Sequence, residues 1–452
     1  MLIKNKIVQS LNIIAVPLII QAISNLVIGI TDQAMIGRIS VSAFGAVGSV
    51  YQLISILVGI MGCTVIIFNI NGSRALGKSA RDEFYEEFTS SIMLSFTLGV
   101  ILLLVITFFK KFILVTVFGF SGSLLKDALD YIGIVKWNIL IQMLIFSANT
   151  YFKINKETKY ILAVSLFSSL LNLLLDYILI FGKIGFSPMG VNGAGYATVI
   201  SLFANLIIYL VICYKDIRIY TKKARIYFRR AWANLQLSLP IMGQEIMENN
   251  VFMMVITAIV SRKGEVALAA FLLLIQVINI LLMPKYMYGA ATLTLVSENT
   301  ESNEYSINRI PKYAIISTLI VFLFASLVIF IFRMDIFYLI NPNESVVSLT
   351  ASLFLVFLIS SVVKIPSTIY SYSLQAVGQS KFVLYSSAAI NIFTMGVLLL
   401  LAYFIKNSVY LFLFFSALSL AVNYGVISLV FKLRYQKKCS EMENLNSGTL
   451  SA

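Results

Sequence analysis

The chain has 452 residues, of which 59% are hydrophobic and only 12% are charged, a composition too apolar for a soluble domain. The formal net charge of +14 would suit a nucleic-acid-binding protein, but so few charges in so apolar a chain favour a membrane protein, and we expect no nucleic-acid partner. The chain has three scattered cysteines and no histidine, which argues against a disulfide framework and excludes Ser-His-Asp, Cys-His and histidine-metal chemistry.

Twelve apolar runs follow one another along the chain, and each is long enough to cross a bilayer as a helix of about 20 residues. None alternates in the manner of a barrel strand, so the backbone polar groups must be satisfied inside helices. The predicted fold class is therefore an all-α polytopic membrane protein. In chain order, the predicted spans are 11–36, 44–70, 90–109, 131–152, 161–181, 191–213, 234–260, 266–291, 313–333, 350–373, 382–405 and 408–431.

Lys and Arg are concentrated in alternate loops between these spans, and the positive-inside rule then places both termini in the cytoplasm. The most basic loop, 214–230, joins the sixth and seventh spans and is interpreted as an anchor to anionic headgroups. We expect a multi-pass protein of a cell membrane, the inner or cytoplasmic membrane of a bacterium, with a disordered tail over 437–452.

The first span carries Asp32 in a segment with no other charged residue from position 7 to 36. An ionised side chain at the centre of a membrane helix costs on the order of 2.5–3.5 kcal/mol on insertion scales, so such groups usually face a bundle interior or an aqueous cavity. At about 100° per residue, Gln21, Asn25 and Asp32 share one face of the helix. This polar stripe makes Asp32 a functional candidate.

Three further acidic residues lie in spans. Asn172 and Asp176 are four apart in the fifth span and share a face, as do Gln244 and Glu248 in the seventh. Glu245 points away from that face and is interpreted as an interfacial or interhelix hydrogen-bonding group.

The second half of the chain repeats the first. The segment VPLIIQAISN (16–25) is echoed by LPIMGQEIMEN (239–249), so that Pro17 matches Pro240 and Gln21 matches Gln244. Such duplication is typical of secondary transporters, in which two bundles alternate around a site near the bilayer midplane. The predicted organisation is a six-helix lobe over 1–213, a basic linker over 214–233, a second six-helix lobe over 234–431 and a cytoplasmic tail over 432–452.

The repeats differ at the acids, because Asp32 falls on Val255 and Asp176 on Met395. We therefore expect an asymmetric cation site in the first lobe. Burial favours the neutral form of a carboxyl group and a nearby cation favours the ionised form, so Asp32 and Asp176 together would exchange a proton, Na⁺ or a cationic substrate. Thr198 in the sixth span would face the same lobe, unless its hydroxyl only bonds its own helix backbone.

The second lobe contains an intramembrane cation, Lys364, two residues before Pro366, and a proline in a span usually marks a bend beside a cavity. One hypothesis pairs Lys364 with Glu248. Proximity in sequence adds further cavity residues, since aromatic and methionine side chains supply adaptable apolar walls. The predicted cavity residues are Gln21, Asn25, Met35, Tyr51, Met61, Tyr177, Gln244, Glu248 and Lys364.

Three motifs resemble those of the multidrug and toxic compound extrusion (MATE) transporters. Pro17 is followed after fourteen residues by DQAMIG (32–37), NLLLDYILIFGKIGFSPMGVNGAGYAT (172–198) resembles the family's fifth and sixth helices, and QAVGQSK (375–381) resembles its loop after the tenth. The resemblance is closest to the DinF-like branch, and it implies that Asp32, Asp176, Asn172 and Thr198 form a cation and proton site. It also matches Glu248 to a glutamate of NorM-like members.

The chain departs from the family pattern at two points. Pro366 stands where NorM-like members carry an aspartate, which indicates an incomplete sodium site in the second lobe. The first-half counterpart of QAVGQSK reads KINKETK (153–159) and lacks the glycine.

The leading prediction is a secondary active exporter of amphipathic, often cationic, organic compounds, driven by inward H⁺ or Na⁺. The alternatives are a flippase for a lipid-linked saccharide or peptide, which should show more cationic cavity residues, and a non-transporting membrane scaffold or sensor. No GxxxxGK[ST] loop is present, so we expect no direct ATP drive, no enzyme activity and no cofactor beyond the coupling ion. We expect a monomer.

Overall fold

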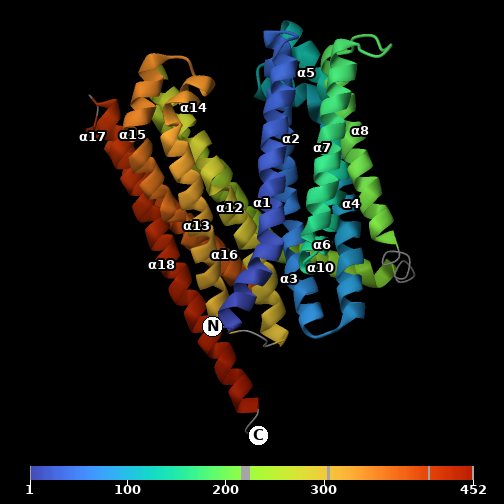
Figure 1. Cartoon of the computed structure of the whole chain (residues 1–452), viewed down its shortest axis with the longest axis vertical. Helices are drawn as coiled ribbons and strands as arrows, with labels where there is room; N and C mark the ends of the chain where they lie inside the picture. The colour runs from blue at the N-terminus through green and yellow to red at the C-terminus, as the bar shows by residue number, and fades with distance from the viewer. Residues whose placement is uncertain (1, 215–223, 303–305, 406–407, 450–452) are drawn as a thin grey trace. The chain divides into compact units, whose positions relative to one another are not determined.

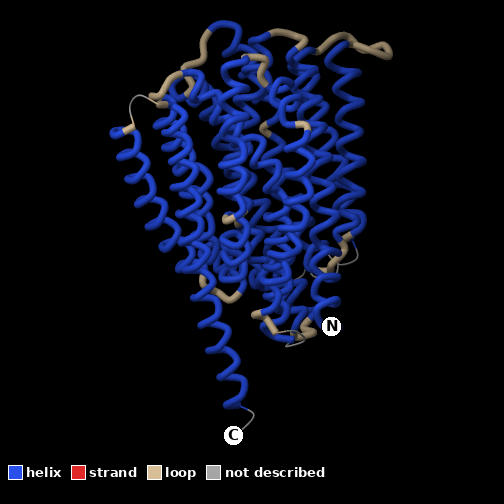
Figure 2. Tube along the Cα trace, turned by 60° about the vertical axis from the view of Figure 1, so that its left-hand side comes forward, coloured by secondary structure: helices blue, strands red, loops and turns tan. Residues whose placement is uncertain are grey.

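The computed structural model describes residues 2–214, 224–302, 306–405 and 408–449. Figure 2 shows these residues as helices and short loops, with no strand among them. The chain divides into two compact units, which we call the N-unit (16–239) and the C-unit (1–15 together with 240–452). The predicted all-α class is confirmed.

The N-unit is built from the helices that are coloured blue to green in Figure 1. They are most of α1 (Leu2–Gly37), α2 (Val41–Gly62), α3 (Thr64–Gly77), α4 (Arg81–Phe112), the π-helical turn η1 (Ile113–Val117), α5 (Gly122–Val135), α6 (Trp137–Ile154), α7 (Thr158–Phe181), α8 (Gly190–Ile212) and the first part of α10 (Ala224–Glu245).

The C-unit contains the remaining helices of the second half, coloured yellow-green to red in Figure 1. They are the end of α10, the π-helical segment η2 (Ile246–Val251), α11 (Phe252–Ser261), α12 (Glu265–Ser302), α13 (Arg309–Ile331), α14 (Arg333–Ile340), α15 (Glu344–Val362), α16 (Lys364–Ala376), α17 (Ser380–Phe404) and α18 (Val409–Thr449).

The described helices fit a multi-pass membrane protein. Ten of them, or ten segments joined across short breaks, are long and apolar enough to span a membrane, and α5 with α6 makes an eleventh that is bent by 42°. The remaining predicted span, 234–260, is divided among α10, η2 and α11, and contains Pro240. Large apolar side chains remain exposed along α13, where Ile320, Leu323 and Phe324 are 59–71% exposed, as expected for a face that contacts lipid.

Both units contain a span that is broken at an equivalent place. The break between α5 and α6 falls at Lys136, within the sequence IVKWN, and the break between α15 and α16 falls at Val363, within VVKIP. Lys364 is the first residue of α16, and Pro366 lies in its first turn. This interruption places Lys364 at its edge, but α15 and α16 still form one candidate span, so the bend beside a cavity that Pro366 suggested stays a prediction.

The unit boundaries lie inside helices rather than at the predicted linker. The chain passes from the C-unit to the N-unit between Ala15 and Val16, and returns between Leu239 and Pro240. The start of α1 therefore packs in the C-unit, and the start of α10 packs in the N-unit. Each helix start thus belongs to the unit that the other half of the chain builds. In α1, Leu11 and Ile14 are fully buried, and Asn12 accepts a hydrogen bond of 2.8 Å from the Tyr288 hydroxyl.

The start of α10 is held in the N-unit by polar contacts. Arg230 contacts Glu86 at 2.7 Å and Glu87 at 2.9 Å, and Asn234 donates to the second oxygen of Glu87 at 2.8 Å. Asn71 of α3 donates to the Asn234 side-chain oxygen at 3.1 Å. Part of the predicted basic linker is thus a docked helix, whereas residues 215–223 of that linker lie outside the described residues.

The prediction of a disordered tail over 437–452 is wrong as far as Thr449, because α18 continues to that residue; positions 450–452 lie outside the described part. An apolar stripe packs this helix as far as Cys439, because Phe431, Tyr435 and Cys439 recur every four residues and are all buried. The Tyr435 hydroxyl also donates to the Ile307 carbonyl at 2.7 Å. The tail sequence is polar overall, but this one face packs in the C-unit.

Candidate functional site

The N-unit brings two carboxyl groups together inside the span region. Asp32 of α1 and Asp176 of α7 lie within hydrogen-bonding range of each other. Two carboxylates at this range repel, so a hydrogen bond between them requires one shared proton. The Oδ1 atoms of both residues are buried and have no hydrogen-bond partner among the described residues. The pair therefore keeps acceptor capacity for a proton or cation.

Three polar side chains surround the pair. Asn172, one turn before Asp176 on α7, interacts with its carboxyl group. Tyr131 of α5 is 5% exposed, hydrogen-bonds to Thr198 of α8, and interacts electrostatically with both aspartates. The Thr198 hydroxyl donates to the Ala194 carbonyl at 2.9 Å, so its oxygen accepts from Tyr131. Thr198 thus bonds its own helix backbone and also contacts Tyr131 beside the acid pair, the two possibilities that the sequence left open.

A close approach of α7 and α8 positions these groups. A Cβ atom on Gly193 would lie 2.7 Å from the backbone carbon of Leu179, so only glycine fits there. The turn between the helices contains Gly182 in the left-handed conformation, at φ +66°, where a side chain would also collide with Pro188. These two glycines lie in the segment 172–198 that carries Asp176 and Thr198.

The polar stripe on α1 faces α7 over more than one turn. Asn25 accepts hydrogen bonds of 3.2 Å from both Ser165 and Ser169, so it joins the two helices. Ser165, Ser169, Asn172 and Asp176 occupy one face of α7 at helical spacing. Asn25 therefore aligns α1 on α7 about two helical turns before Asp32, and Gln21 is half-buried in the same stripe.

The other predicted lining residues of the N-unit lie apart from one another. Met35 and Met61 are partly buried against the apolar core that α2, α4 and α5 build. Tyr51 is 61% exposed and interacts electrostatically with Tyr131, whereas Tyr177 is 48% exposed and lies against Phe181. Of these four, only Tyr51 is connected to the acid pair, through Tyr131.

The C-unit holds a second polar cluster, centred on Glu248 in η2. Gln244 donates to Glu248 at 3.1 Å and lies 3.1 Å from the Ser371 hydroxyl. Gln375 in turn donates to the Gln244 side-chain oxygen at 2.9 Å, and Ser387 hydrogen-bonds to Glu248. The matched glutamine of the repeat thus belongs to a network across α10, α16 and α17.

The hypothesis that Lys364 pairs with Glu248 is wrong for the described residues, where no ion pair joins them. The cation that interacts electrostatically with Glu248 is Lys285 of α12. Lys364 instead lies over the Tyr424 ring, at 4.7 Å from its centroid, and interacts with Lys285. The sequence contained a signal for Lys285, because it is an intramembrane lysine directly after Pro284.

Tyr131 and Lys285 are the site residues that sequence reasoning missed. Tyr131 stands at the edge of the fourth predicted span, and a single tyrosine at such a position carries no distinguishing pattern. Glu245 interacts with Glu248 and Tyr286 on the neighbouring α12. Among the described residues, no group of three or more His, Cys, Asp or Glu side chains forms a metal site.

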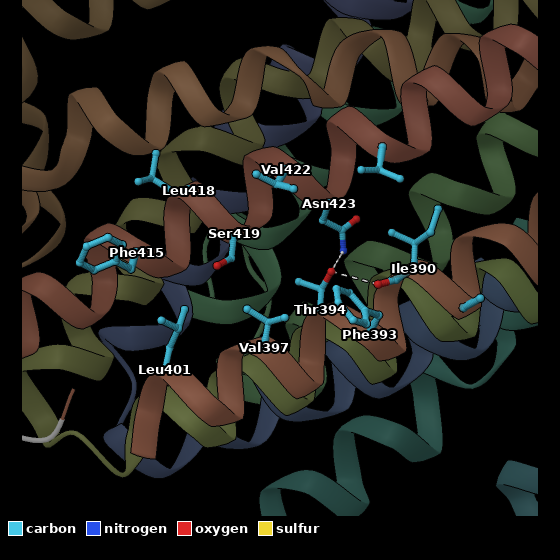
Figure 3. Close-up of a pocket in the computed structure, with 12 residues that line it drawn as sticks. Ile390, Phe393, Thr394, Val397, Leu401, Phe415, Leu418, Ser419, Val422 and Asn423 are labelled. Atoms are coloured by element: carbon cyan, nitrogen blue, oxygen red, sulfur yellow. Dashed lines mark hydrogen bonds between the residues drawn. The ribbon is translucent and has the colours of Figure 1, made fainter. Parts of the chain in front are cut away.

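Figure 3 shows a groove between α17 and α18 in the C-unit, with a volume of about 560 Å³. Its lining is apolar and includes Phe393 and Val422, which are 74% and 65% exposed. Two polar residues of its wall bond each other, since Asn423 donates to Thr394 at 2.9 Å, and Asn423 also donates to Asn391 at 3.0 Å. This groove offers apolar contact area, and no charged residue is among the described residues that line it.

The sequence profile of the MatE family matches residues 17–178 and 240–404. The two matched segments begin at Pro17 and Pro240, the pair that also begins the internal repeat.

Two relatives and one solved structure are similar over much of the chain. The probable multidrug resistance protein NorM of Thermotoga maritima is 24% identical over 349 residues, which cover 75% of this chain and 73% of that protein. The uncharacterized transporter YisQ of Bacillus subtilis is 25% identical over 260 residues, and the chain spans only 56% of its length. The crystal structure of the Vibrio cholerae MATE transporter VcmN in the bent form has a TM-score of 0.85 at 17% identity, covering 98% of this chain and 99% of that one, and shows the same fold.

Proposed function

The chain belongs to the MatE family of transporters, and from this premise we propose that it is a secondary active exporter of amphipathic, often cationic, organic compounds in exchange for inward H⁺ or Na⁺. The protein is a transporter and not an enzyme. The DinF-like branch named from the motifs remains a prediction. The names of relatives such as NorM of Thermotoga maritima support multidrug export as the activity to test.

The observation that carries this proposal is the pairing of Asp32 with Asp176. A pair that holds one proton has one remaining charge to neutralise, and a second proton, Na⁺ or a substrate cation can each do so. Once one of these cations is bound, the pair has no remaining negative charge, so the other cations are not bound at the same time. This mutual exclusion converts an inward ion gradient into outward movement of a cation.

The surroundings of the pair suit a coupling role. Tyr131 and Thr198 form a hydrogen bond beside the carboxyl groups, and Asn172 adds an amide from α7. Side-chain amide, hydroxyl and carboxylate oxygens are ligands that a hard cation such as Na⁺ accepts. In our proposal these residues bind the coupling ion, which is transported and is not a resident cofactor.

We also propose the cellular setting. The basic loops support an orientation with both termini in the cytoplasm of a bacterial cell. Apolar exposure along α13 is compatible with a monomer surrounded by lipid.

The test is efflux of a cationic dye from a drug-sensitised host under an imposed pH or sodium gradient. We expect the wild type to export the dye, and Asp32→Asn and Asp176→Asn to reduce export to the level of cells without the protein. The matched control is Asp335→Asn, which removes an exposed carboxylate on α14 and should leave export unchanged. Efflux that persists in both site variants would refute the coupling role.

The gradient that drives wild-type efflux identifies the coupling ion. Absence of dye export under every gradient would instead favour the flippase alternative, which would then be tested with a lipid-linked saccharide.

A further inference from the structure

The polar cluster of the C-unit contains lysines, whereas no lysine among the described residues acts on the acid pair of the N-unit. Lys285 lies near Glu248 and Lys364 lies near Lys285, and all three are inside predicted spans. We propose that Lys364, with Lys285 behind it, forms a subsite for a carboxylate on the transported compound. The inference rests on the proposed export function and deepens it by naming the residue that would recognise one group of the substrate.

Lys285 and Glu248 carry opposite charges and interact with each other. Glu248 interacts electrostatically with Lys285, accepts a hydrogen bond from Gln244 and contacts Ser387, whose hydroxyl also donates to the Leu384 carbonyl. Lys285 is 7% exposed, and its Nζ atom lies 4.5 Å from the centroid of the Tyr286 ring. The glutamate thus has a complete set of partners within the C-unit.

Lys364 has no such partner. Its ammonium group makes neither an ion pair nor a hydrogen bond with any described residue, and its contacts are the Tyr424 ring at 4.7 Å and the like charge of Lys285. Glu245 interacts with Glu248 and Tyr286. A cation held in a membrane span without an anion is costly, and a carboxylate from a ligand would remove that cost.

Part of the Lys364 surface is exposed at the edge of a helix break. Lys364 is only partly buried, in contrast to Lys285, and it begins α16 at the break after α15. The Ser428 hydroxyl of α18 donates to the Tyr424 carbonyl at 2.7 Å and lies 3.2 Å from the Val363 carbonyl, so α18 packs directly against the break. Tyr424 supplies an aromatic surface beside the ammonium group, which suits the ring of an aromatic carboxylate.

The probes are two rhodamine dyes that differ at one group. Rhodamine 110 carries a free carboxylate, and rhodamine 123 is the methyl ester of the same molecule. We would measure binding of each dye to the purified full-length protein in detergent by fluorescence anisotropy, and efflux of each from whole cells. Wild type, Lys364→Met and Lys364→Arg are compared, with Lys312→Met, an exposed lysine on α13, as the control.

We expect Lys364→Met to weaken binding of rhodamine 110 by about tenfold or more, the usual effect of losing a charged hydrogen-bond partner, and to change rhodamine 123 by less than about twofold. Lys364→Arg should retain most of the affinity for rhodamine 110, and Lys312→Met should behave like wild type. Unchanged melting temperatures would confirm that the variants are folded.

Equal losses for both dyes in Lys364→Met would show that the lysine only supports the fold, and would overturn the inference. Binding of rhodamine 123 but not rhodamine 110 by the wild type would also overturn it, while leaving the exporter proposal intact. If the carboxylate dye binds through Lys364 but neither dye is exported under any gradient, the exporter proposal fails and the subsite stands.

Discussion

The two units share backbone features but differ in the charges placed on them. In the N-unit, Asp32 and Asp176 form an acid pair, whereas in the C-unit Glu248 interacts with Lys285, and Lys285 with Lys364. Both units have a span broken in a Val-Lys sequence and a first helix that contains a proline. Duplication has thus retained the bends and turns, while the ionisable side chains have diverged.

One turn illustrates this most directly. Lys156 follows α6 with φ +60°, and Gly378 follows α16 with φ +79°. The same hydrogen bonds close both turns: Glu157 N–H donates to the Phe152 carbonyl at 2.8 Å, and Gln379 N–H donates to the Leu374 carbonyl at 2.8 Å. The missing glycine in KINKETK therefore changes the strain of the turn and not its shape.

The largest expected difference concerns ion coupling. Asp176→Asn should abolish gradient-driven dye transport in proteoliposomes, because the remaining acid cannot share a proton with an amide as it does with a carboxyl group. Glu248→Gln should slow transport by about tenfold or less and keep its dependence on the imposed gradient, since the hydrogen bonds of Gln244 and Ser387 can be remade. Gradient dependence lost in Glu248→Gln but kept in Asp176→Asn would reverse the assignment of the units.

A second difference concerns the tight glycines. Gly193→Ala should lower stability by about 1–3 kcal/mol, because the new methyl group meets the backbone of Leu179, which cannot rotate away. Gly289→Ala in α12 meets only the ring of Tyr372, at 2.5 Å, and a side chain can turn aside, so the loss should be about 1 kcal/mol.

Melting temperatures in detergent would rank these two variants. Gly193→Ala should also reduce dye transport, because a displaced α8 would move Thr198 away from Tyr131. A larger loss of stability in Gly289→Ala would contradict this account of the two contacts.

The first parts of α1 and α10, which precede Pro17 and Pro240, are held by contacts of unequal strength. Glu87→Ala removes a buried carboxylate that accepts from Arg230 and Asn234, which should cost about 2 kcal/mol after allowance for the partial exposure of Arg230. Tyr288→Phe removes one neutral hydrogen bond to Asn12 and should cost about 1 kcal/mol. Thermal unfolding of the two variants checks the order, and equal melting temperatures would remove the distinction.

The smallest expected effect lies in the turn after α6. Lys156→Gly should stabilise the protein by about 0.5–1 kcal/mol by relieving the left-handed conformation, a rise in melting temperature of about 1–2 °C. Gly378→Ala should shift the melting temperature in the opposite direction. A fall in the melting temperature of Lys156→Gly would mean that contacts of the lysine outweigh the backbone strain.

The sequence was informative where a group is out of place in a membrane. Acids in apolar spans are rare enough to identify Asp32 and Asp176, and helical spacing correctly placed Asn172 beside Asp176. Spacing gives the face of a helix but not the neighbouring helix, so Lys364 was assigned to Glu248 when Lys285 is its electrostatic partner. Tyr131 could not be found, because its role depends on how α5 packs against α7 and α8.

The placement of the helix starts also has consequences for biosynthesis. Residues 2–15 pack with residues from 240 onward, so Leu11 and Ile14 have no buried surroundings while only the first half has been synthesised. The start of α10, made just after the sixth span, completes the N-unit at once through Arg230 and Asn234. The N-terminal segment therefore has no packing partner until the second half of its own chain has been synthesised. If the ribosome stalls midway, the apolar face of this segment stays unpacked.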